Sequence, residues 1–473
     1  MVETCLRALS QLRLLGVSKG SLVNTIDRAA GRWTTGKTGM IAAPCQIIHV
    51  DLHEHPGGLE IGRGYRSALV VFWSRGRPLG RVLLVAGEFP LPPASVASLA
   101  AQAIAPALGV LIAPRSFAAM LPDCDNDTAN LTVVDPALLD RTLDRVAPPS
   151  DGAASACAQT SVIVCTRERP ELLEECLAAL VRLAPSPLEI IVVDNAPPAG
   201  MSSLQVVENF EGVSYLRHPS AGLSSARNAG LALARGDYVA FTDDDSIVHP
   251  RWLVSLLTCL AKDGVGCVTG LVLPRELETE AQMAFEFVLG GFSPGFVPLI
   301  FGQDFFASTR PFGVPVWRIG AGASMAFRRE VFAAIGLFDE RLGAGASGCS
   351  EDSELWYRLL AAGWECRYEP SAVVFHRHRL SWDALESQIV AYMRGHVAAL
   401  LVQFVRTRDL GNIRRIFLTL PYVYTTGVIK ALFARNWRRL RMDVCAIRGC
   451  LGGLRPRYLS RDRSCAPQHT APA

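Results

Sequence analysis

Between residues 161 and 260, short apolar runs alternate with amphipathic segments, and this alternation constrains the fold more than any other feature of the chain. The runs SVIVC (161–165), LEIIVVD (188–194) and YVAFTD (238–243) are typical of buried strands, and RPELLEECLAALVRL (169–183) is typical of a helix with proline in its first turn. Strands that alternate with helices form a mostly parallel sheet covered by helices on both faces. We therefore predict an α/β fold for this region.

The pattern also predicts a strand over VSYLRH (213–218), a helix over LSSARNAGLALARG (223–236) that Gly236 ends, and a helix over PRWLVSLLTCLA (250–261). In such sheets, ligands bind beyond the carboxyl ends of the strands. Polar residues that follow the strands are therefore the first candidates for a functional site.

Three carboxylates follow the strand-like run YVAFTD directly, at Asp243, Asp244 and Asp245. In an extended chain, Asp243 and Asp245 point to the same side and Asp244 points to the other. Carboxylate oxygens are the ligands that a hard divalent cation prefers, so the pattern favours a metal site. The alternative is a solvated acidic turn in which Asp245 or Ser246 caps the next helix.

Two other polar stretches lie where a ligand is expected. Asp194 follows a buried strand and is placed to accept hydrogen bonds from a base or ribose, although an Asx-turn is the alternative. The stretch that begins at Gly222 offers free backbone N–H groups at a helix start, with Arg227 one turn further on. Both features suit an anion such as a diphosphate, and an ordinary capped helix is the alternative.

The segment from Gly348 to Arg379 holds further candidates. Glu351 and Asp352 stand at the start of a predicted helix, where a rigidly placed carboxylate is able to accept a proton. The strand-like run AVVFHRHR carries His376 and His378, which alternate to the same side. They are candidates for a nitrogen ligand or a phosphate contact, and a purely structural role is the alternative.

The order and spacing of these segments resemble those of family 2 glycosyltransferases with the GT-A fold. The resemblance extends from about Gln159 to Arg379, a little under half of the chain, and departs from the family pattern at Cys349-Ser350, where Gly-Gly is usual, and at Glu354, where Asp is common. The matching segments are SVIVCTRERP, IIVVDNA, GLSSARNAGL, GDYVAFTDDDS, GAGASMAFRREVFAAIGLFDERL, EDSELWYRLLAAG and YEPSAVVFHRHR.

The resemblance implies a donor site for a nucleotide-diphosphate sugar. Thr166, Glu168 and Asp194 would lie around the base and ribose, and Arg227 would approach the nucleotide or its diphosphate. These four positions are expectations taken from the family pattern.

The resemblance also implies a metal site and a catalytic base. Asp243–Asp245 match the DxD motif, with Asp245 as the direct metal ligand and Asp243 or Asp244 in contact with the metal or the ribose. Asp352 would be the base, and His378 or His376 would add a metal or diphosphate contact. The expected cofactor is Mg²⁺ or Mn²⁺.

The implied reaction is a single displacement that inverts the anomeric centre, with a glycan, a lipid-linked molecule or a small molecule as acceptor. Processive synthases carry several spanning helices and a Gln-x-x-Arg-Trp motif, and neither is found here, so we expect the addition of one sugar. The alternatives are a catalytically silent module that binds a sugar nucleotide or glycan, and a scaffold at a membrane surface.

The remaining sequence predicts a leader, a small β-rich domain with a helix, and a helical tail. From Arg406 to Arg463 there are 14 Lys and Arg against three acidic residues, although the net charge of the chain is only +3. Basic clusters flank the apolar stretch 416–433, which predicts contact with anionic membrane, and packing on the domain is the alternative. The expected divisions are 1–35, 36–115, 116–158, 159–400 and 401–473.

The cysteines and the N-terminus indicate where the protein resides. The 13 cysteines include no CxxC pair and several lie in apolar runs, which is typical of thiols in a reducing compartment. We find no signal peptide, and we expect a cytoplasmic protein or one at the inner face of the cell membrane. No nucleic-acid partner is expected. His49, His53 and His55 are interpreted as surface residues rather than a metal site.

Overall fold

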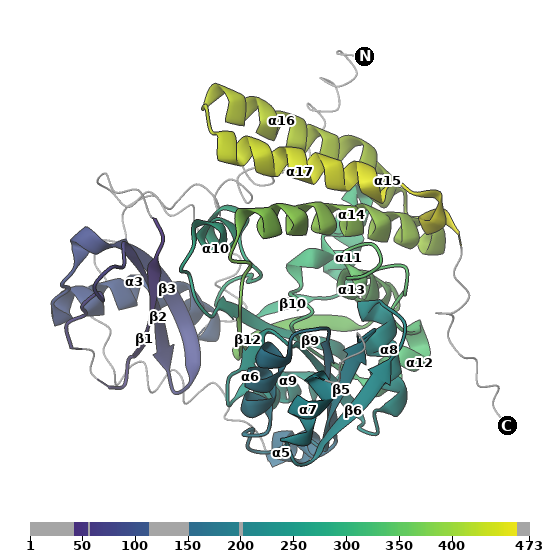
Figure 1. The fold of residues 1–473 in the computed structure, drawn as a ribbon, viewed down its shortest axis with the longest axis horizontal. Helices are drawn as coiled ribbons and strands as arrows, with labels where there is room; N and C mark the ends of the chain where they lie inside the picture. Colours follow the sequence, from purple (N-terminus) through teal and green to yellow (C-terminus); the bar gives the residue numbers. More distant parts are fainter. Residues whose placement is uncertain (1–41, 55–56, 113–150, 198–201, 461–473) are drawn as a thin grey trace.

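The computed structural model describes residues 42–54, 57–112, 151–197 and 202–460 of the 473-residue chain. The predicted leader, most of the predicted connector, His55 and the end of the tail lie outside this part. Figure 1 shows three regions: a small N-terminal sheet, a large central sheet with its helices, and a stack of long C-terminal helices. The expected division into domains stays a prediction.

One half of the central sheet is parallel, as predicted from the alternation of strands and helices. Its neighbouring strands are β6 (Val213–His218), β5 (Glu189–Asn195), β4 (Thr160–Thr166) and β7 (Tyr238–Asp243). The carboxyl ends of β4, β5 and β7 therefore meet at one edge, which we call the carboxyl edge. Thr166, Asp194 and Asp243 are the last or penultimate residues of these three strands.

The other half makes the sheet mixed rather than uniformly parallel. Strand β11 (Ser324–Arg328) runs antiparallel between β7 and β9 (Val265–Pro274), and β12 (Glu365–His376) runs parallel to β9. Strand β11 has this direction because the chain enters it from the carboxyl edge, where Ser324 lies opposite Thr242. The outer strands β10 (Leu299–Phe301) and β8 (Ser246–Val248) pair antiparallel with β12.

Helices cover both faces of the sheet, which confirms this part of the prediction. Each face has its own buried core, because alternate residues of every strand point to opposite sides. One face packs against α5 (Asp151–Cys157), α6 (Pro170–Leu180) and α9 (Trp252–Leu260), with α7 (Ser202–Glu208) beside α6. The other packs against α8 (Leu223–Leu233), α12 (Arg329–Ile335) and α13 (Glu351–Ala361). Short helices between β9 and β11 are α10 (Glu280–Met283), the π-helix η2 (Ala284–Val288), α11 (Gln303–Thr309), η3 (Arg310–Phe312) and η4 (Val316–Arg318).

The N-terminal sheet consists of β1 (Cys45–Asp51), β2 (Ser67–Ser74) and β3 (Arg77–Val85), with β1 parallel and β3 antiparallel to β2. The turn η1 (Ala86–Glu88) leads to helix α3 (Pro93–Ile112), which packs on one face of the sheet. Residues of the opposite face, such as Leu69 and Val71, belong to the core of the central sheet. The small sheet is therefore fused to the rest of the molecule through a common core.

The C-terminal region is helical, as the sequence predicts. Helix α14 (Trp382–Thr407) is continuous across residues 400 and 401, where the tail was expected to begin. It is followed by α15 (Leu410–Arg414), the π-helix η5 (Arg415–Thr419), α16 (Leu420–Phe433), α17 (Trp437–Gly453) and η6 (Pro456–Leu459). A Cβ on Gly449 of α17 would lie 2.5 Å from the Val390 oxygen of α14, so only glycine allows these two helices to approach this closely.

Gly236 does not end its helix directly, and Pro421 and Gly427 leave helix α16 continuous. Helix α8 ends at Leu233, and Gly236 instead allows the turn before β7, where a Cβ would lie 2.5 Å from the Gln159 oxygen. Pro421 does not interrupt the apolar stretch, because it stands in the first turn of α16. Gly427 faces the carboxylate of Asp443 on α17 and leaves α16 continuous.

Candidate functional site

The three consecutive aspartates end β7 and the turn that follows it, at the carboxyl edge. Asp243, Asp245 and His376 each offer a ligand atom, and these atoms all lie within 4.8 Å of one another. Asp244 points elsewhere, where its carboxylate accepts hydrogen bonds from Thr166 Oγ1 at 2.9 Å and Arg169 at 3.2 Å. The Asp244 side chain therefore points away from those of Asp243 and Asp245, as the alternation along an extended chain predicts.

The cluster fits a divalent cation on the chemistry of its donor set. Two carboxylates and one imidazole are ligands that suit Mg²⁺, Mn²⁺ or a similar ion. Asp245 Oδ1 is buried and has no hydrogen-bond partner, although it lies 3.2 Å from His376 Nε2. A buried carboxylate oxygen without a donor is unfavourable, and a cation at this position would satisfy it. This unpartnered atom is the structural sign that the residues suit a metal ion.

His376, and not His378, is the histidine beside the aspartates. Strand β12 pairs with β8 so that His376 lies opposite Ser246, the residue that follows Asp245. His378 lies two residues beyond, and its Nε2 is 3.1 Å from a carboxylate oxygen of Glu286. The sequence left the choice between the two histidines open and favoured His378, and the pairing of the strands places His376 at the cluster instead.

The three aspartates differ in the direction of their pKa shifts. Burial raises the pKa of Asp243, and burial followed by repulsion from Asp245 raises the pKa of Asp244 to about 6. Burial would also raise the pKa of Asp245, but His376, together with the charges of Arg169 and Arg379, outweighs it and holds that pKa well below the ordinary value. Asp245 is therefore the member of the cluster that is most firmly ionised.

The expected nucleotide contacts stand along the same edge. Asp194 ends β5 and is buried; its Oδ2 accepts a hydrogen bond from Tyr215 at 2.9 Å, and its Oδ1 has no partner. Thr166 ends β4 and donates to Asp244. Glu168 stands in the loop after β4 with φ of 56°, an uncommon value for a residue with a side chain, and its side chain is exposed beside Arg167.

Arg227 lies at the centre of the site and is almost fully buried. It donates to Glu351 Oε1 at 2.7 Å and to Asp243 Oδ1 at 3.3 Å. Its guanidinium also lies 5.5 Å from the centre of the Phe338 ring. The structure therefore engages Arg227 with carboxylates of this chain, whereas the sequence predicted contact with a nucleotide or diphosphate.

Glu351 and Asp352 diverge from the start of α13, as adjacent helical residues do. Glu351 is buried against Arg227, and burial, together with repulsion from Asp352, raises its pKa to about 7. Asp352 is half-buried, and its two oxygens accept from the backbone N–H of Gly322 at 2.9 Å and of Ser353 at 2.6 Å. A Cβ on Gly322 would lie 3.0 Å from Arg227 and 3.1 Å from Asp352. Gly322, in the loop before β11, thus lies next to both Asp352 and Arg227, and Arg227 in turn contacts Asp243.

Several residues of the site were not singled out from the sequence. Arg169 contacts both Asp244 and Asp245, at 3.2 Å and 3.1 Å, and its place beyond the first strand was a usable signal. Gly322 and Tyr215 contribute a backbone N–H and a phenol that no local pattern distinguishes. Glu286 and Arg81, which form an ion pair behind His378, come from segments far apart in the sequence.

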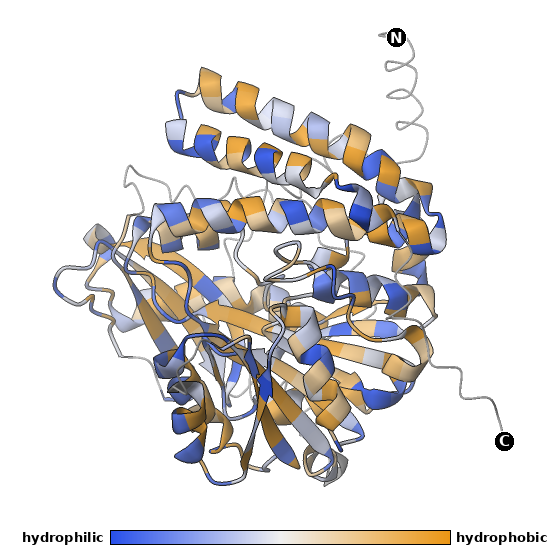
Figure 2. Ribbon diagram, turned by 45° about the vertical axis from the view of Figure 1, so that its right-hand side comes forward, coloured by the Kyte–Doolittle hydropathy of each residue, from blue (hydrophilic) through white to orange (hydrophobic). Residues whose placement is uncertain are grey.

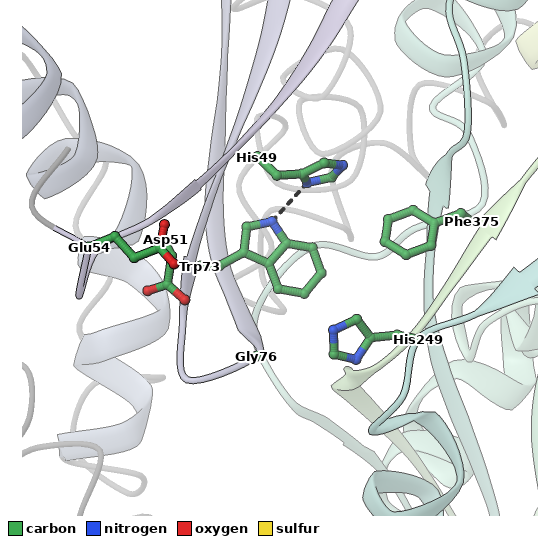
Figure 3. Close-up of a pocket in the computed structure, with 7 residues that line it drawn as sticks. All are labelled: His49, Asp51, Glu54, Trp73, Gly76, His249 and Phe375. Atoms are coloured by element: carbon green, nitrogen blue, oxygen red, sulfur yellow. Dashed lines mark hydrogen bonds between the residues drawn. The ribbon is translucent and has the colours of Figure 1, made fainter. Parts of the chain in front are cut away.

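A cavity of about 310 Å³ lies between the N-terminal sheet and the central sheet, and none of the three consecutive aspartates lines it. Figure 3 shows the Trp73 indole next to His49, with Phe375 and His249 on its other side. Trp73 donates to His49 Nδ1 at 2.9 Å and stacks on His249 with ring centres 5.3 Å apart. These rings join the two sheets, and among the described residues no metal-ligand cluster includes His49 or His53.

All ten cysteines in the described ranges are free thiols, and most of them are buried. Among the described residues, three helices are long and apolar enough to cross a membrane by length and composition: Pro93–Val110, Trp382–Thr407 and Leu410–Phe433. The sequence had indicated no such set of helices, so the expectation that one sugar is added rests on the missing Gln-x-x-Arg-Trp motif alone.

The fold and the site define a class of α/β protein with an acidic, metal-suited cluster at the carboxyl edge of its sheet. The model of the family described as Glycosyl transferase family 2 matches residues 161–336. The succinoglycan biosynthesis protein ExoM of Rhizobium meliloti is 30% identical over 238 residues, which cover 47% of this chain and 69% of that protein. The chain belongs to glycosyl transferase family 2.

Other similar proteins match parts of the chain. Pre-mycofactocin glycosyltransferases of two Mycobacterium tuberculosis strains are 30% identical over 270 residues, or 56% of this chain. The matched part spans about half, 52%, of the length of these relatives. A solved mannosyltransferase from Pyrobaculum calidifontis, in complex with GDP-Man and Mn²⁺, aligns with a TM-score of 0.45 and 18% identity, covering 63% of this chain and 87% of that one.

Proposed function

We propose that this protein transfers one sugar from a nucleotide-diphosphate sugar to an acceptor hydroxyl. The observation that carries the proposal is the cluster of Asp243, Asp245 and His376 at the carboxyl edge, where Arg227 links Asp243 to Glu351, the residue before Asp352. Membership of the glycosyltransferase family supports the reaction class. The acceptor belongs to the glycan, lipid-linked or small-molecule classes, and no feature of the site favours nucleic acid.

The donor is proposed to bind between the ends of β4, β5 and β7. Asp194 Oδ1 is buried without a partner, so a hydroxyl or N–H group of a ribose or base that donates to it would relieve an unfavourable state. Thr166, at the end of β4, and Glu168, in the loop that follows, are the remaining proposed nucleotide contacts. Arg227 contributes positive charge near the diphosphate through its position beside Asp243, rather than as a free anion-binding side chain.

Asp243, Asp245 and His376 would hold the Mg²⁺ or Mn²⁺ ion. When bound, such an ion neutralises the charge that develops on the departing diphosphate. Arg169 holds Asp244 and Asp245 in place from the side of β4. Arg227 contacts Asp243 at 3.3 Å, so both carboxylates of the cluster are held by an arginine before any ligand arrives.

Asp352 is proposed as the base of a single, inverting displacement. The bond between the anomeric carbon and the diphosphate breaks as the acceptor oxygen bonds to that carbon from the opposite face, and Asp352 takes the hydroxyl proton while the nucleoside diphosphate leaves. Glu351 is unsuited to this role because it is buried and engaged by Arg227. The backbone N–H groups of Gly322 and Ser353 fix the orientation of the Asp352 carboxylate.

The test is the turnover of Asp352→Asn and Glu351→Gln with a panel of nucleotide sugars, with the anomeric configuration of the product read by NMR. The asparagine variant keeps the size of the side chain but cannot accept the proton, so turnover should fall about 10²–10⁴-fold with donor affinity nearly unchanged. The glutamine variant should be affected more mildly. A near-normal rate for Asp352→Asn, or retained configuration, contradicts the mechanism. Donor binding without any transfer would favour the silent sugar-nucleotide-binding module.

We also propose that α16 and the start of α17 contact the surface of an anionic membrane. In an apolar 18-residue window of Leu410–Phe433 only 17% of the residues are buried, and Phe433 and Trp437 are 88% and 66% exposed. Figure 2 shows hydrophobic residues along these outermost helices at the top of the molecule. Exposed basic residues adjoin them, including Arg435 and Arg438, the latter also 3.3 Å from Glu280. Apolar side chains bordered by cations suit an interface with anionic lipid.

Flotation with vesicles of phosphatidylglycerol and phosphatidylcholine tests this contact. The double variant Phe433→Asp with Trp437→Asp should lose most of its vesicle binding, and raising the salt concentration should weaken binding of the unmodified protein. Leu188→Asp is the control, because Leu188 is an exposed apolar residue on the central domain, far along the chain from α16. Equal flotation of all three proteins rejects the proposal. Membrane binding would place the protein at the inner face of the cell membrane.

A further inference from the structure

The N-terminal sheet is linked to the aspartate cluster by a continuous chain of buried polar side chains. Arg81 of β3 forms an ion pair with Glu286 of the π-helix η2, and Glu286 Oε2 lies 3.1 Å from His378 Nε2. His378 Nδ1 lies 3.2 Å from His376 Nδ1, and His376 Nε2 faces Asp245. These contacts join segments up to 205 residues apart.

The middle of this series of polar side chains is closed to solvent. The side chains of Glu286 and His378 are each 1% exposed, and that of Arg81 is 15% exposed. Phe285 packs edge-on against the His378 ring with centres 4.7 Å apart, and Phe292 does so against His376 at 5.0 Å. A charged carboxylate in such apolar surroundings requires a partner, and Arg81, after burial itself, is the largest influence on Glu286, holding its pKa at about 2. Glu286 is therefore an ionised acceptor.

The fixed charge of Glu286 determines where the protons sit on both histidines. An ionised carboxylate only accepts hydrogen bonds, so His378 Nε2 must carry a proton. In a neutral imidazole the other nitrogen, Nδ1, is then an acceptor, and His376 Nδ1 must donate to it. His376 Nε2 is then the ring nitrogen left to face the cluster, 3.2 Å from Asp245 Oδ1.

The local backbone is built to admit Glu286. The π-helix η2 is a rare conformation that occurs frequently at functional sites. Gly291 has φ of 59°, and a Cβ there would lie 2.5 Å from Glu286 Oε2. Any side chain at this position would push the carboxylate away from His378. A π-helix and a glycine in the left-handed region together leave room for one buried carboxylate.

We propose that Arg81, Glu286 and His378 are positioning residues that hold His376 Nε2 ready to bind the metal ion, so that the N-terminal sheet completes the metal site. The inference rests on the proposed metal site of the transferase. Groups that orient a metal-binding histidine from behind typically contribute 10- to 100-fold to metal affinity. The N-terminal sheet is thereby more than an appended domain, because it supplies the cation that keeps Glu286 ionised.

The test is a titration of the full-length protein with Mn²⁺ alone, followed by electron paramagnetic resonance of the free ion. Glu286→Ala removes the acceptor and should weaken Mn²⁺ binding about 10- to 100-fold. Glu286→Gln retains an oxygen that can accept from His378 Nε2 and should recover part of that loss. Arg81→Gln should weaken binding less than Glu286→Ala but measurably.

Arg77→Gln is the matched control. Arg77 is also on β3, is similarly buried, and forms an ion pair of 2.9 Å with Glu369 of β12, but it has no link to His376. Both arginine variants should lose similar stability in thermal melts without metal, and only Arg81→Gln should lose metal affinity. Should Glu286→Ala fail to fold, the comparison of Arg81→Gln with Arg77→Gln decides the question.

Three outcomes have distinct meanings. Equal Mn²⁺ affinity in Glu286→Ala and the unmodified protein, or equal losses in the two arginine variants, overturns the positioning role and leaves the proposed transferase intact. Absence of Mn²⁺ binding in the unmodified protein overturns the metal site and the positioning role together. Mn²⁺ binding that depends on Arg81, in a protein without transferase activity, supports the positioning role and refutes the proposed function.

Discussion

Replacing Glu351 by glutamine is expected to stabilise the metal-free protein at alkaline pH, even though the substitution removes a buried ion pair. Glu351 accepts a hydrogen bond from Arg227 at 2.7 Å, and its side chain is 7% exposed. Burial and the nearby Asp352 nevertheless outweigh Arg227 and raise the pKa of Glu351 from 4.5 to about 7. The ionised carboxylate is thus less stable in the folded protein than in the unfolded chain.

The sign and size of the effect follow from the linkage between proton binding and folding. A raised carboxyl pKa means that the folded protein binds more protons than the unfolded chain between pH 4.5 and about 7, so stability falls as the pH rises through this window. Each pKa unit corresponds to about 1.4 kcal/mol, so the full cost above pH 7 is about 3 kcal/mol. Glutamine resembles the protonated side chain and does not titrate. The variant should therefore gain under about 1 kcal/mol at pH 5 and about 3 kcal/mol at pH 8, relative to the unmodified protein.

Urea unfolding in EDTA at several values between pH 5 and pH 8 measures this difference. Glu354→Gln is the control, because Glu354 is buried one turn along the same helix and pairs with Arg358 at 2.8 Å. Breaking that buried pair should cost about 3–5 kcal/mol. A loss of stability at pH 8 in Glu351→Gln, comparable to the control, refutes the reasoning, since it would mean that attraction to Arg227 exceeds the cost of burial.

Three further substitutions test the donor and metal sites. Asp245→Ala should abolish metal-stimulated turnover, and full activity of this variant in EDTA would disprove the metal role. Asp194→Asn should weaken donor binding about 10- to 100-fold, because a hydrogen bond to a charged group is lost, and calorimetry with the donor measures it. Gly322→Ala places a Cβ 3.0 Å from Arg227 and 3.1 Å from Asp352 Oδ2, so the turnover number and the donor affinity should both fall; an unchanged turnover number would argue against Asp352 as the base.

The positions of the donor-side residues could be predicted because they depend on local pattern. The runs that became β4, β5 and β7 are apolar and short, so the sequence alone placed Thr166, Asp194 and Asp243 at strand ends. In a parallel sheet those ends must meet at one edge, whatever the details of packing. Resemblance to a known family then gave each residue an expected role.

The packing partners of the same residues could not be read from the chain. Local pattern placed Arg227 one turn inside a helix start, which suggested a free anion-binding side chain. The fold instead brings Glu351 to it across 124 residues, and the two charges satisfy each other in a buried position. No local rule distinguishes an arginine that meets a ligand from one that meets a carboxylate of its own chain.

The choice between His376 and His378 likewise depended partly on local pattern and partly on tertiary contacts. The sequence determined that both histidines lie at the end of a strand and on one side of it, because side chains alternate with a period of two. Only the pairing of β12 with β8 decided that His376 meets Asp245, and only the docking of the N-terminal sheet brought Arg81 to Glu286 behind His378. Periodicity is a property of neighbouring residues, whereas strand register and buried ion pairs depend on contacts between segments that folding alone brings together.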